Sequence, residues 1–256
     1  MDGEYGTKEY STFPREESPR VKPKPHCTQM SNPLHPRMYL VTAATQFELA
    51  PFLRALPDDF RCEHLVTGVG PVETTLRLTL RLAAGASRFA GVINLGVAGA
   101  YPRDMGAAGL LDICLAEREV LGDLGICAGD TIDSLASERL EILDSFALDA
   151  NLLAAAEKAL CAARIEYLRG VFVTVSCASG SARRGALLAE QHDGLCENME
   201  GAAAARVCGH FGLPLLEVRC ISNLVEDRGQ QRWRLHEACV CCGETAARIL
   251  TGIHHE

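Results

Sequence analysis

The chain has 256 residues, of which 48% are hydrophobic and 23% are charged. This balance provides enough apolar surface for a sizeable core and excludes a chain that is disordered throughout. The net charge of −8 and the lack of a Lys/Arg block argue against nucleic-acid binding. The sequence has neither a signal peptide's apolar core nor an apolar run near the roughly 18 residues that span a bilayer, so we expect a cytoplasmic protein without membrane partners.

Residues 1–37 differ in composition from the rest of the chain. They contain six prolines and mixed charge but almost no aliphatic residues. Such a segment cannot bury enough apolar area to offset its ordering entropy, so we expect a disordered N-terminal extension. It is a partner-binding tail, a floppy extension, or the result of a start codon assigned too early, with Met38 as the real start. Residues 38–256 are expected to form a single domain.

From Met38 onward, short apolar segments alternate with helical patterns, which is typical of an α/β fold with parallel βαβ units. The expected strands are 38–44, 64–67, 91–95, 110–115, 170–175 and 213–221. The expected helices are 48–55, 72–83, 152–163, 182–190, 199–210 and 235–250.

Small residues follow three of the expected strands, at 43–45, 68–70 and 96–99. Glycine allows a ligand to approach the backbone closely, and the N-termini of the following helices present N–H groups to it. Ligands of open α/β sheets bind outside the carboxyl ends of strands. Three such turns at one sheet edge therefore indicate a ligand crevice.

Two glutamates are candidates for chemistry in this crevice. Glu200 lies among Met199, Gly201 and four alanines, where an ionised carboxylate needs a partner or a ligand hydroxyl. The structural alternative is a salt bridge to Arg219 on the next strand, and the two roles are compatible. Glu48 begins the first helix, where a carboxylate is also favourable with the helix dipole alone.

Asn223 follows Ser222 at the end of the last expected strand, 23 residues beyond Glu200. One helix and one strand join the two side chains, so they can meet in one pocket. Asn223 is alternatively a simple turn residue. Two acids and an amide around a glycine-lined crevice suit acid–base chemistry on a sugar-like ligand.

The twelve cysteines are scattered, as expected for reduced core residues, except for Cys239, Cys241 and Cys242 near His236. This cluster is either a metal or redox site or part of a packed helix. A second pair that would complete a four-ligand zinc set is lacking, so we favour the packed helix. We expect neither a metal nor an organic cofactor.

Five segments carry a resemblance to the nucleoside phosphorylase/nucleosidase family: VTAATQFEL, TGVG, VINLGVAGAY, ENMEGAAAA and VRCISNLVEDRGQQRW. The resemblance extends from about Tyr39 to the C-terminus. The first four are shared broadly with methylthioadenosine/S-adenosylhomocysteine nucleosidases, and the last is most similar to futalosine hydrolases. The family implies a three-layer α/β fold with a twisted, mostly parallel mixed sheet flanked by helices, and a homodimer or larger homo-oligomer.

The resemblance also implies roles for individual residues. Glu48 resembles the glutamate that activates the attacking water, and Glu200 the one that binds the ribose hydroxyls beside Met199. Arg219 and Ser222 resemble residues that flank base and sugar.

The implied reaction is hydrolysis of an N-ribosidic bond through a ribosyl cation-like state. The backbone at Ala98 and Gly99 resembles one wall of the nucleoside site, with the glycine turn at Gly70 nearby. The segment 174–179 resembles the opposite wall.

Asn223 distinguishes branches of the family, because adenosine-type nucleosidases have an aspartate there. A carboxamide can donate to N7, to O6 or to both in a hypoxanthine base, so this residue favours a 6-oxopurine such as futalosine contains. Arg228 and Trp233 are candidates for binding the 5′ carboxyphenyl group of futalosine. For Trp233, ordinary core packing is an equal alternative. Arg232 is expected to be a solvated surface residue.

Three alternatives remain open at this stage. A phosphorylase is disfavoured because Glu48 replaces an arginine and Val97 a hydroxyl-bearing residue. A methylthioadenosine/S-adenosylhomocysteine or aminofutalosine nucleosidase is disfavoured by Asn223. A non-catalytic nucleoside sensor is disfavoured because both glutamates are present.

Overall fold

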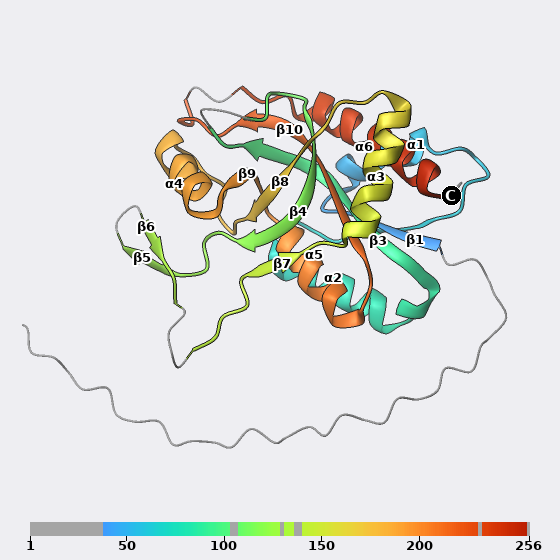
Figure 1. Ribbon diagram of the computed structural model, residues 1–256, viewed down its shortest axis with the longest axis horizontal. Coiled ribbons are helices and arrows are strands. Elements are labelled where there is room, and N and C mark those ends of the chain that lie inside the picture. The colour runs from blue at the N-terminus through green and yellow to red at the C-terminus, as the bar shows by residue number, and fades with distance from the viewer. Residues whose placement is uncertain (1–37, 103–106, 129–130, 136–139, 230–231, 255–256) are drawn as a thin grey trace, which may run out of the picture. The chain divides into compact units, whose positions relative to one another are not determined.

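The computed structural model describes residues 38–102, 107–128, 131–135, 140–229 and 232–254. The extension at residues 1–37, predicted to be disordered, lies outside these ranges. Within them, helices pack around a central sheet (Figure 1). None of the described helices is long and apolar enough to cross a membrane.

The described strands belong to one large sheet and one small hairpin. The large sheet contains β1 (Met38–Ala43), β2 (Glu63–Val66), β3 (Phe89–Ala100), β4 (Ile113–Leu121), β7 (Ser145–Ala147), β8 (Leu168–Thr174), β9 (Gly194–Asn198) and β10 (Leu215–Leu224). The hairpin joins β5 (Ile126–Ala128) to β6 (Thr131–Asp133). The helices are α1 (Gln46–Ala55), α2 (Pro71–Ala83), α3 (Ala150–Ala163), α4 (Ala182–His192), α5 (Gly201–Phe211) and α6 (Leu235–His254), with a short 3₁₀ turn η1 (Ala86–Arg88).

The strand order of the large sheet is β10-β4-β8-β9-β3-β1-β2, with β7 beside β4 and a further pairing of β10 with β3. The five strands β3, β10, β4, β8 and β9 therefore form a closed ring, from which β1 and β2 extend. Of the eight described pairings, five are parallel and three antiparallel. The predicted mixed, mostly parallel sheet is confirmed.

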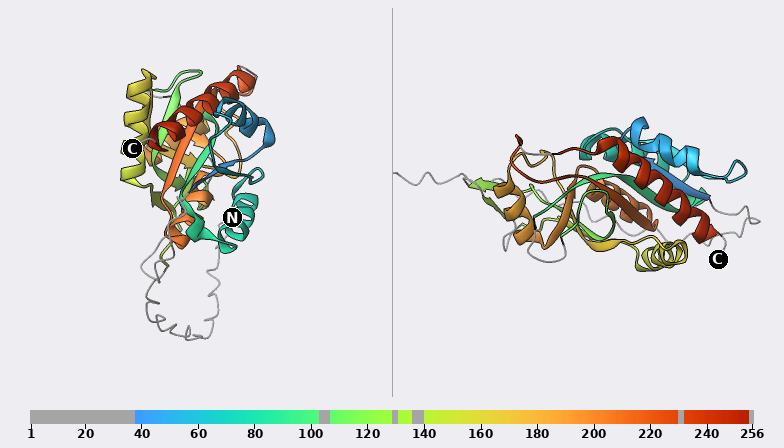
Figure 2. Two further views of the ribbon diagram at one scale, coloured as in Figure 1. Left: turned by 90° about the vertical axis from the view of Figure 1, so that its right-hand side faces the viewer. Right: turned by 90° about the horizontal axis from the view of Figure 1, so that it is seen from above.

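Helices cover the sheet on two sides (Figures 1 and 2). Helices α1, α3 and α6 enclose a large apolar core together with β1, β3 and β10. A second core lies between α2, α5 and the other side of β1 and β3. Helix α4 packs against β8, and Leu188 belongs to a smaller apolar cluster together with Val171 and Val173. The three-layer arrangement predicted from the sequence is confirmed.

Two differences from the sequence-based expectation matter for the site. Strand β3 does not end at residue 95 but continues through the glycines to Ala100, because it pairs with β10 as far as Leu224. Strand β9 was not predicted at all. Its five residues, GLCEN, are all buried although none is β-branched, so tertiary pairing with β8 and β3 determines their conformation.

Candidate active site

A cavity of about 340 Å³ lies where β1, β3, β8, β9 and β10 end. It is lined by Ala44, Thr45, Phe47, Glu48, Val69, Val97, Ala98, Gly99, Val175, Ala178, Ser179, Glu197, Asn198, Met199, Glu200, Ser222, Asn223, Trp233 and Leu235. Several predicted residues therefore meet in one pocket: both glutamates, Asn223, Ser222, Met199 and the backbone at Ala98 and Gly99. The segment 174–179 forms part of the opposite wall, as predicted.

Glu48 is held at the start of α1 by a capping box. Thr45 caps the helix by accepting the Glu48 N–H at 3.2 Å, and Glu48 Oε2 in turn accepts the Thr45 N–H at 3.1 Å and its hydroxyl at 2.8 Å. The other oxygen, Oε1, accepts the N–H of Val97 on β3 at 3.2 Å. The side chain is only 7% exposed. Helix capping and a place at the cavity wall are thus combined in one residue.

Glu200 occupies the N-cap position of α5 and is 5% exposed. Its Oε1 accepts the N–H of Gly70 at 3.0 Å, and its Oε2 lies 3.4 Å from both terminal nitrogens of Arg219. Gly70 has a φ of 90°, a left-handed conformation that glycine adopts without strain. The turn before α2 therefore orients the carboxylate through its backbone, and the sequence-predicted salt bridge to Arg219 is present.

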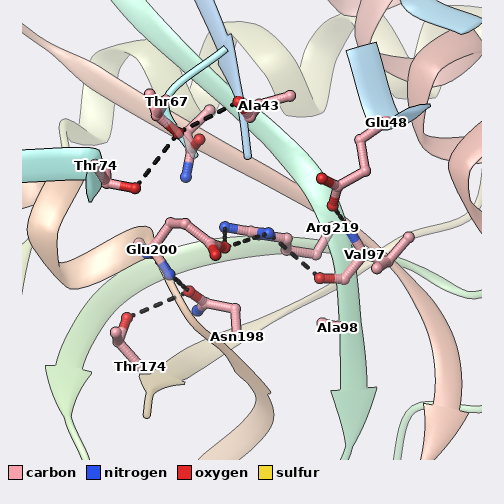
Figure 3. Close-up of polar contacts among 12 residues, drawn as sticks. Ala43, Glu48, Thr67, Thr74, Val97, Ala98, Thr174, Asn198, Glu200 and Arg219 are labelled. Atoms are coloured by element: carbon pink, nitrogen blue, oxygen red, sulfur yellow. Dashed lines mark hydrogen bonds and ion pairs between the residues drawn. The ribbon is translucent and has the colours of Figure 1, made fainter. Parts of the chain in front are cut away.

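Arg219 lies between the two glutamates and pairs with Glu200 (Figure 3). Its guanidinium donates to the Val97 carbonyl at 3.3 Å and pairs with Glu217 at 2.8 Å. Burial alone would lower the pKa of Arg219, but Glu217, Glu200 and Glu48 raise it above its usual value. One buried cation therefore balances three carboxylates. Breaking such a buried pair costs about 3–5 kcal/mol, so Arg219 fixes the site's geometry.

Beneath Glu200 lies a second pair of carboxyl groups, Glu119 and Glu217, both fully buried. A Cβ on Gly201 would lie 2.0 Å from Glu119 Oε1 and 2.4 Å from Glu217 Oε2, so this position requires glycine. Burial, together with the charge of Glu217, raises the pKa of Glu119 well above its usual value. A proton on Glu119 supplies a donor for Glu217 Oε2, which has no other hydrogen-bond partner among the described residues.

The first turn of α5 is tied to this pair. Asn198 Oδ1 accepts the N–H of Glu200 at 2.9 Å and of Gly201 at 2.7 Å, and its Nδ2 donates to Glu119 at 2.7 Å. Thr174 accepts the Ala202 N–H at 2.8 Å and donates to Glu119 at 2.7 Å. The helix end that carries Glu200 is therefore supported by side chains from β8 and β9.

Asn223 lies on the wall of the cavity, at the point where β10 has a bulge. Its Oδ1 accepts the Ser222 hydroxyl at 3.0 Å, and its Nδ2 donates to the Leu224 carbonyl at 3.4 Å. Because the carbonyl end of the amide is bound by Ser222, the second hydrogen on Nδ2 is available to a ligand. Ser222 thus sets the orientation of the predicted base-binding amide.

The mouth of the cavity is apolar. Phe47 and Val69 line one part of it and Trp233 and Leu235 another, and all four side chains are at least 41% exposed. Trp233 is 57% exposed, so the alternative of core packing for this residue is wrong. Phe47, which also contacts the His236 ring, was not singled out from the sequence.

Three predicted binding residues are not at the cavity wall. Gly70 and Arg219 lie behind Glu200 and bind its two oxygens. Arg228 is exposed beyond the end of β10, and its backbone N–H donates to the Gly180 carbonyl at 3.1 Å. Arg232 is exposed, as expected.

The cysteine cluster lies on α6, away from the cavity wall. Cys239 and Cys242 are buried, and Cys242 belongs to the core that α6 forms with β10. No group of three or more His, Cys, Asp or Glu side chains suited to a metal occurs among the described residues. The packed-helix interpretation accounts for these positions.

Sequence reasoning missed Glu197 and the role of Ser179. Glu197 lies on β9, is 6% exposed and faces the cavity. The Ser179 N–H donates to its Oε1 at 2.8 Å and the Ser179 hydroxyl to its Oε2 at 2.6 Å. The only available signal was a second acidic residue three positions before Glu200, which does not identify a strand.

Comparison with known proteins agrees with this geometry. Residues 64–254 match the phosphorylase superfamily. The chain belongs to this superfamily. It is 30% identical over 225 residues to the futalosine hydrolase of Thermus thermophilus, an alignment that covers 83% of this chain and 95% of that protein. It is also 30% identical over 202 residues to the futalosine hydrolase of Streptomyces coelicolor, covering 77% and 81%.

Solved structures give the same fold. A methylthioadenosine/S-adenosylhomocysteine nucleosidase of Helicobacter pylori superimposes with a TM-score of 0.71 at 21% identity, covering 85% of this chain and 99% of that one. The native futalosine hydrolase of Helicobacter pylori gives a TM-score of 0.68 at 22% identity, covering 86% and 98%. The predicted family, fold and enzyme class, an N-glycosidase, are confirmed.

Proposed function

We propose that this protein hydrolyses the N-ribosidic bond of futalosine and releases hypoxanthine, as a step of menaquinone biosynthesis. The observation that carries the proposal is the meeting of Glu48, Glu200 and Asn223 at the wall of one cavity. The similarity to two proteins named futalosine hydrolase, over most of their length, supports the same substrate.

The two glutamates suit the two demands of the reaction. As the purine leaves, positive charge develops on the ribose, and a buried carboxylate stabilises it strongly because little water screens it. Glu200, held by Gly70 and Arg219, is in position for this role and for binding the ribose hydroxyls. Glu48, fixed by Thr45 and Val97, is the acceptor that orients and deprotonates water.

Water is a better nucleophile than phosphate in this site. The backbone N–H of Val97 would be a natural donor to an anion, but Glu48 already occupies it at 3.2 Å. Val97 adds an isopropyl group instead of a hydroxyl, and Glu48 itself repels a dianion. These contacts support hydrolysis over phosphorolysis.

The leaving base is best matched by a 6-oxopurine. Asn223 presents Nδ2 as a donor because Ser222 binds its Oδ1. Both N7 and O6 of hypoxanthine are acceptors, so either of them can accept the free hydrogen on Nδ2, and this bond stabilises the negative charge on the departing base. The exposed aromatic residues at the mouth, Phe47 and Trp233, offer apolar surface to the 5′ aryl group.

We also propose that the chain forms a homodimer through α2. Val72, Leu76 and Leu80 recur every four residues on this helix and are 53–77% exposed, and Val69 continues the stripe to the cavity. A contiguous apolar stripe of this kind is typical of an interaction surface. A second copy would cover it.

The proposal is tested by assaying purine release from futalosine in phosphate-free buffer, with the products identified by chromatography. We expect hypoxanthine to appear at a rate that added phosphate does not increase. Adenine release from aminofutalosine or methylthioadenosine, without hypoxanthine release from futalosine, would instead support the adenosine-type alternative. Binding without release of any base would support the non-catalytic sensor.

A further inference from the structure

Glu197 is a buried carboxylate in the cavity wall to which the proposed reaction assigns no role. It comes from β9, and both of its oxygens are held by Ser179, at 2.8 Å and 2.6 Å. These two donors fix the plane of the carboxylate without using all its lone pairs. The free lone pairs remain available to a ligand in the cavity that Glu197 lines.

The sheet register places Glu197 opposite Asn223. Gly99 on β3 pairs with Glu197 of β9 on one side and with Asn223 of β10 on the other. Directly paired residues project from the same face of a sheet, and neighbouring strands are about 4.8 Å apart. The two polar side chains therefore flank Gly99, separated at the backbone by roughly two strand spacings, or about 10 Å.

Gly99 allows the Asn223 amide to pack close to the β3 backbone. A Cβ at this position would lie 3.1 Å from Asn223 Nδ2 and 3.2 Å from a methyl group of Val225, so a side chain there would crowd the amide. Glu197, Gly99 and Asn223 all line the cavity, with an acceptor and a donor on either side of the Gly99 backbone. A flat heterocycle bound there would have its polar edges facing the two side chains.

The order of donor and acceptor selects among purines. A 6-oxopurine has acceptors at N7 and O6 and, next to O6, a donor at N1–H. A 6-aminopurine has the opposite pattern at the same two positions: its exocyclic amine is a donor and its N1 is an acceptor. Asn223 Nδ2 donates and an ionised Glu197 only accepts, so both match the 6-oxopurine and Glu197 opposes the N1 lone pair of adenine.

We propose that Glu197 is a specificity-determining residue that accepts the N1–H of a 6-oxopurine base bound between it and Asn223. This inference rests on the proposed function, since it takes the cavity to be a nucleoside site. It adds a second contact, from a different strand, to the recognition by Asn223.

The burial of Glu197 disfavours its ionised form. Burial raises the pKa of Glu197 above its usual value, although the two hydrogen bonds from Ser179, the hydroxyl of Tyr101 and the charge of Arg184 lower it. A carboxylate in this environment is stabilised as an ion when a ligand N–H donates to it. The N1–H of the base is such a donor, so base binding and ionisation of Glu197 favour each other.

The test compares the binding of free hypoxanthine and adenine to wild-type protein and to Glu197→Gln by calorimetry. A glutamine turns one of its ends into a donor that adenine N1 accepts. We expect the hypoxanthine preference of the wild type to fall by about 10- to 100-fold, the range for one charged hydrogen bond. Glu190→Gln makes the same change at an exposed position on α4, outside the cavity wall, and as the matched control it should retain the preference.

Several outcomes would overturn the inference. An unchanged preference in Glu197→Gln, or an equal loss of both bases, would assign Glu197 to supporting the wall at Ser179 alone. If the variant does not fold, 1-methylhypoxanthine tests the wild type directly: binding at least 10-fold weaker than hypoxanthine is expected, and equal binding contradicts the role. If the wild type binds no purine and cleaves no nucleoside, the proposed function itself fails.

Discussion

At the scale of single residues, Glu200 is the side chain on which the proposed chemistry depends most. Replacing it by glutamine keeps its shape and its contact with Gly70 but removes the charge that stabilises the ribosyl cation. Losing such a group typically costs a factor of 10² to 10³ in kcat. We expect Glu200→Gln to lose at least about 10²-fold in kcat for purine release while its circular dichroism stays native.

Glu244→Gln is the matched control, because Glu244 is exposed on α6, outside the cavity wall. It should keep wild-type activity. A fully active Glu200→Gln would remove Glu200 from the reaction.

The second prediction at the residue scale concerns the selection of the base by Asn223. An aspartate in its place turns the donor into an acceptor, which repels N7 and O6 but suits an exocyclic amine. We expect Asn223→Asp to shift the ratio of kcat/KM from futalosine towards aminofutalosine by about 10- to 100-fold. An unchanged ratio, measured with both substrates at equal enzyme concentration, would place base recognition elsewhere in the cavity.

The residues of the proposed chemistry could be predicted from the sequence more readily than the neighbouring residues that hold them or line the same cavity. Glu48, Glu200 and Asn223 stand at the ends of predicted elements, where local patterns place polar groups. Glu197 was missed because its position depends on the pairing of β9 with β3, which is a long-range contact. For the same reason Arg219 was predicted to flank the ligand, whereas its contacts with Glu200 and Glu217 place it behind the wall.

At the scale of elements, the start of α5 rests on the carboxyl pair Glu119 and Glu217. The pKa of Glu119 is raised in the folded protein, so the folded state holds this proton more tightly than the unfolded chain does. The resulting stabilisation is fully present below the usual pKa of 4.5 and is lost as the pH rises through the pKa of the folded state. The unfolding free energy should therefore fall with rising pH across this window. The two groups are predicted to share one proton at the base of the active site.

Glu119→Gln tests this account of α5. The glutamine amide carries a permanent hydrogen where the proton stood, so the variant's unfolding free energy should decline less with pH than that of the wild type. Urea unfolding at a series of pH values measures the slope. Glu190→Gln, at an exposed position on α4, is the control and should keep the wild-type slope, and an unchanged slope in Glu119→Gln would contradict the shared proton.

The helices were predicted well because their sequence patterns are local. The strands β3 and β9 were predicted poorly because pairing with distant strands determines their extent. Helices such as α2 and α4 begin within one residue of their expected starts, because their apolar spacing and their caps are contained in the sequence. Strand β9 has no β-branched residue, and β3 runs through glycines that usually end a strand. Both are held by neighbours far away in the chain.

At the scale of the whole molecule, the exposed stripe on α2 predicts self-association. Leu76→Asp places a charge at the centre of this stripe, and we expect it to convert a dimer into a monomer in light scattering coupled to gel filtration. Ala154→Asp, which adds the same charge to an exposed position on α3, should remain dimeric. A wild-type protein that is monomeric at all concentrations would contradict the proposed interface.

Other whole-molecule expectations stay predictions. The segment 1–37, for which disorder is predicted, lies outside the described residues, and the cytoplasmic location is an expectation from the sequence. The fold and the superfamily do not depend on either, because they rest on the described part of the chain.

The central claim is that a carboxylate and an amide on opposite sides of Gly99 select a 6-oxopurine nucleoside for hydrolysis. The most direct test is kcat/KM for futalosine and for aminofutalosine, measured side by side without phosphate. These substrates differ only at position 6 of the base. We expect futalosine to be preferred by at least about 10²-fold, whereas equal rates or a preference for aminofutalosine would contradict this selection.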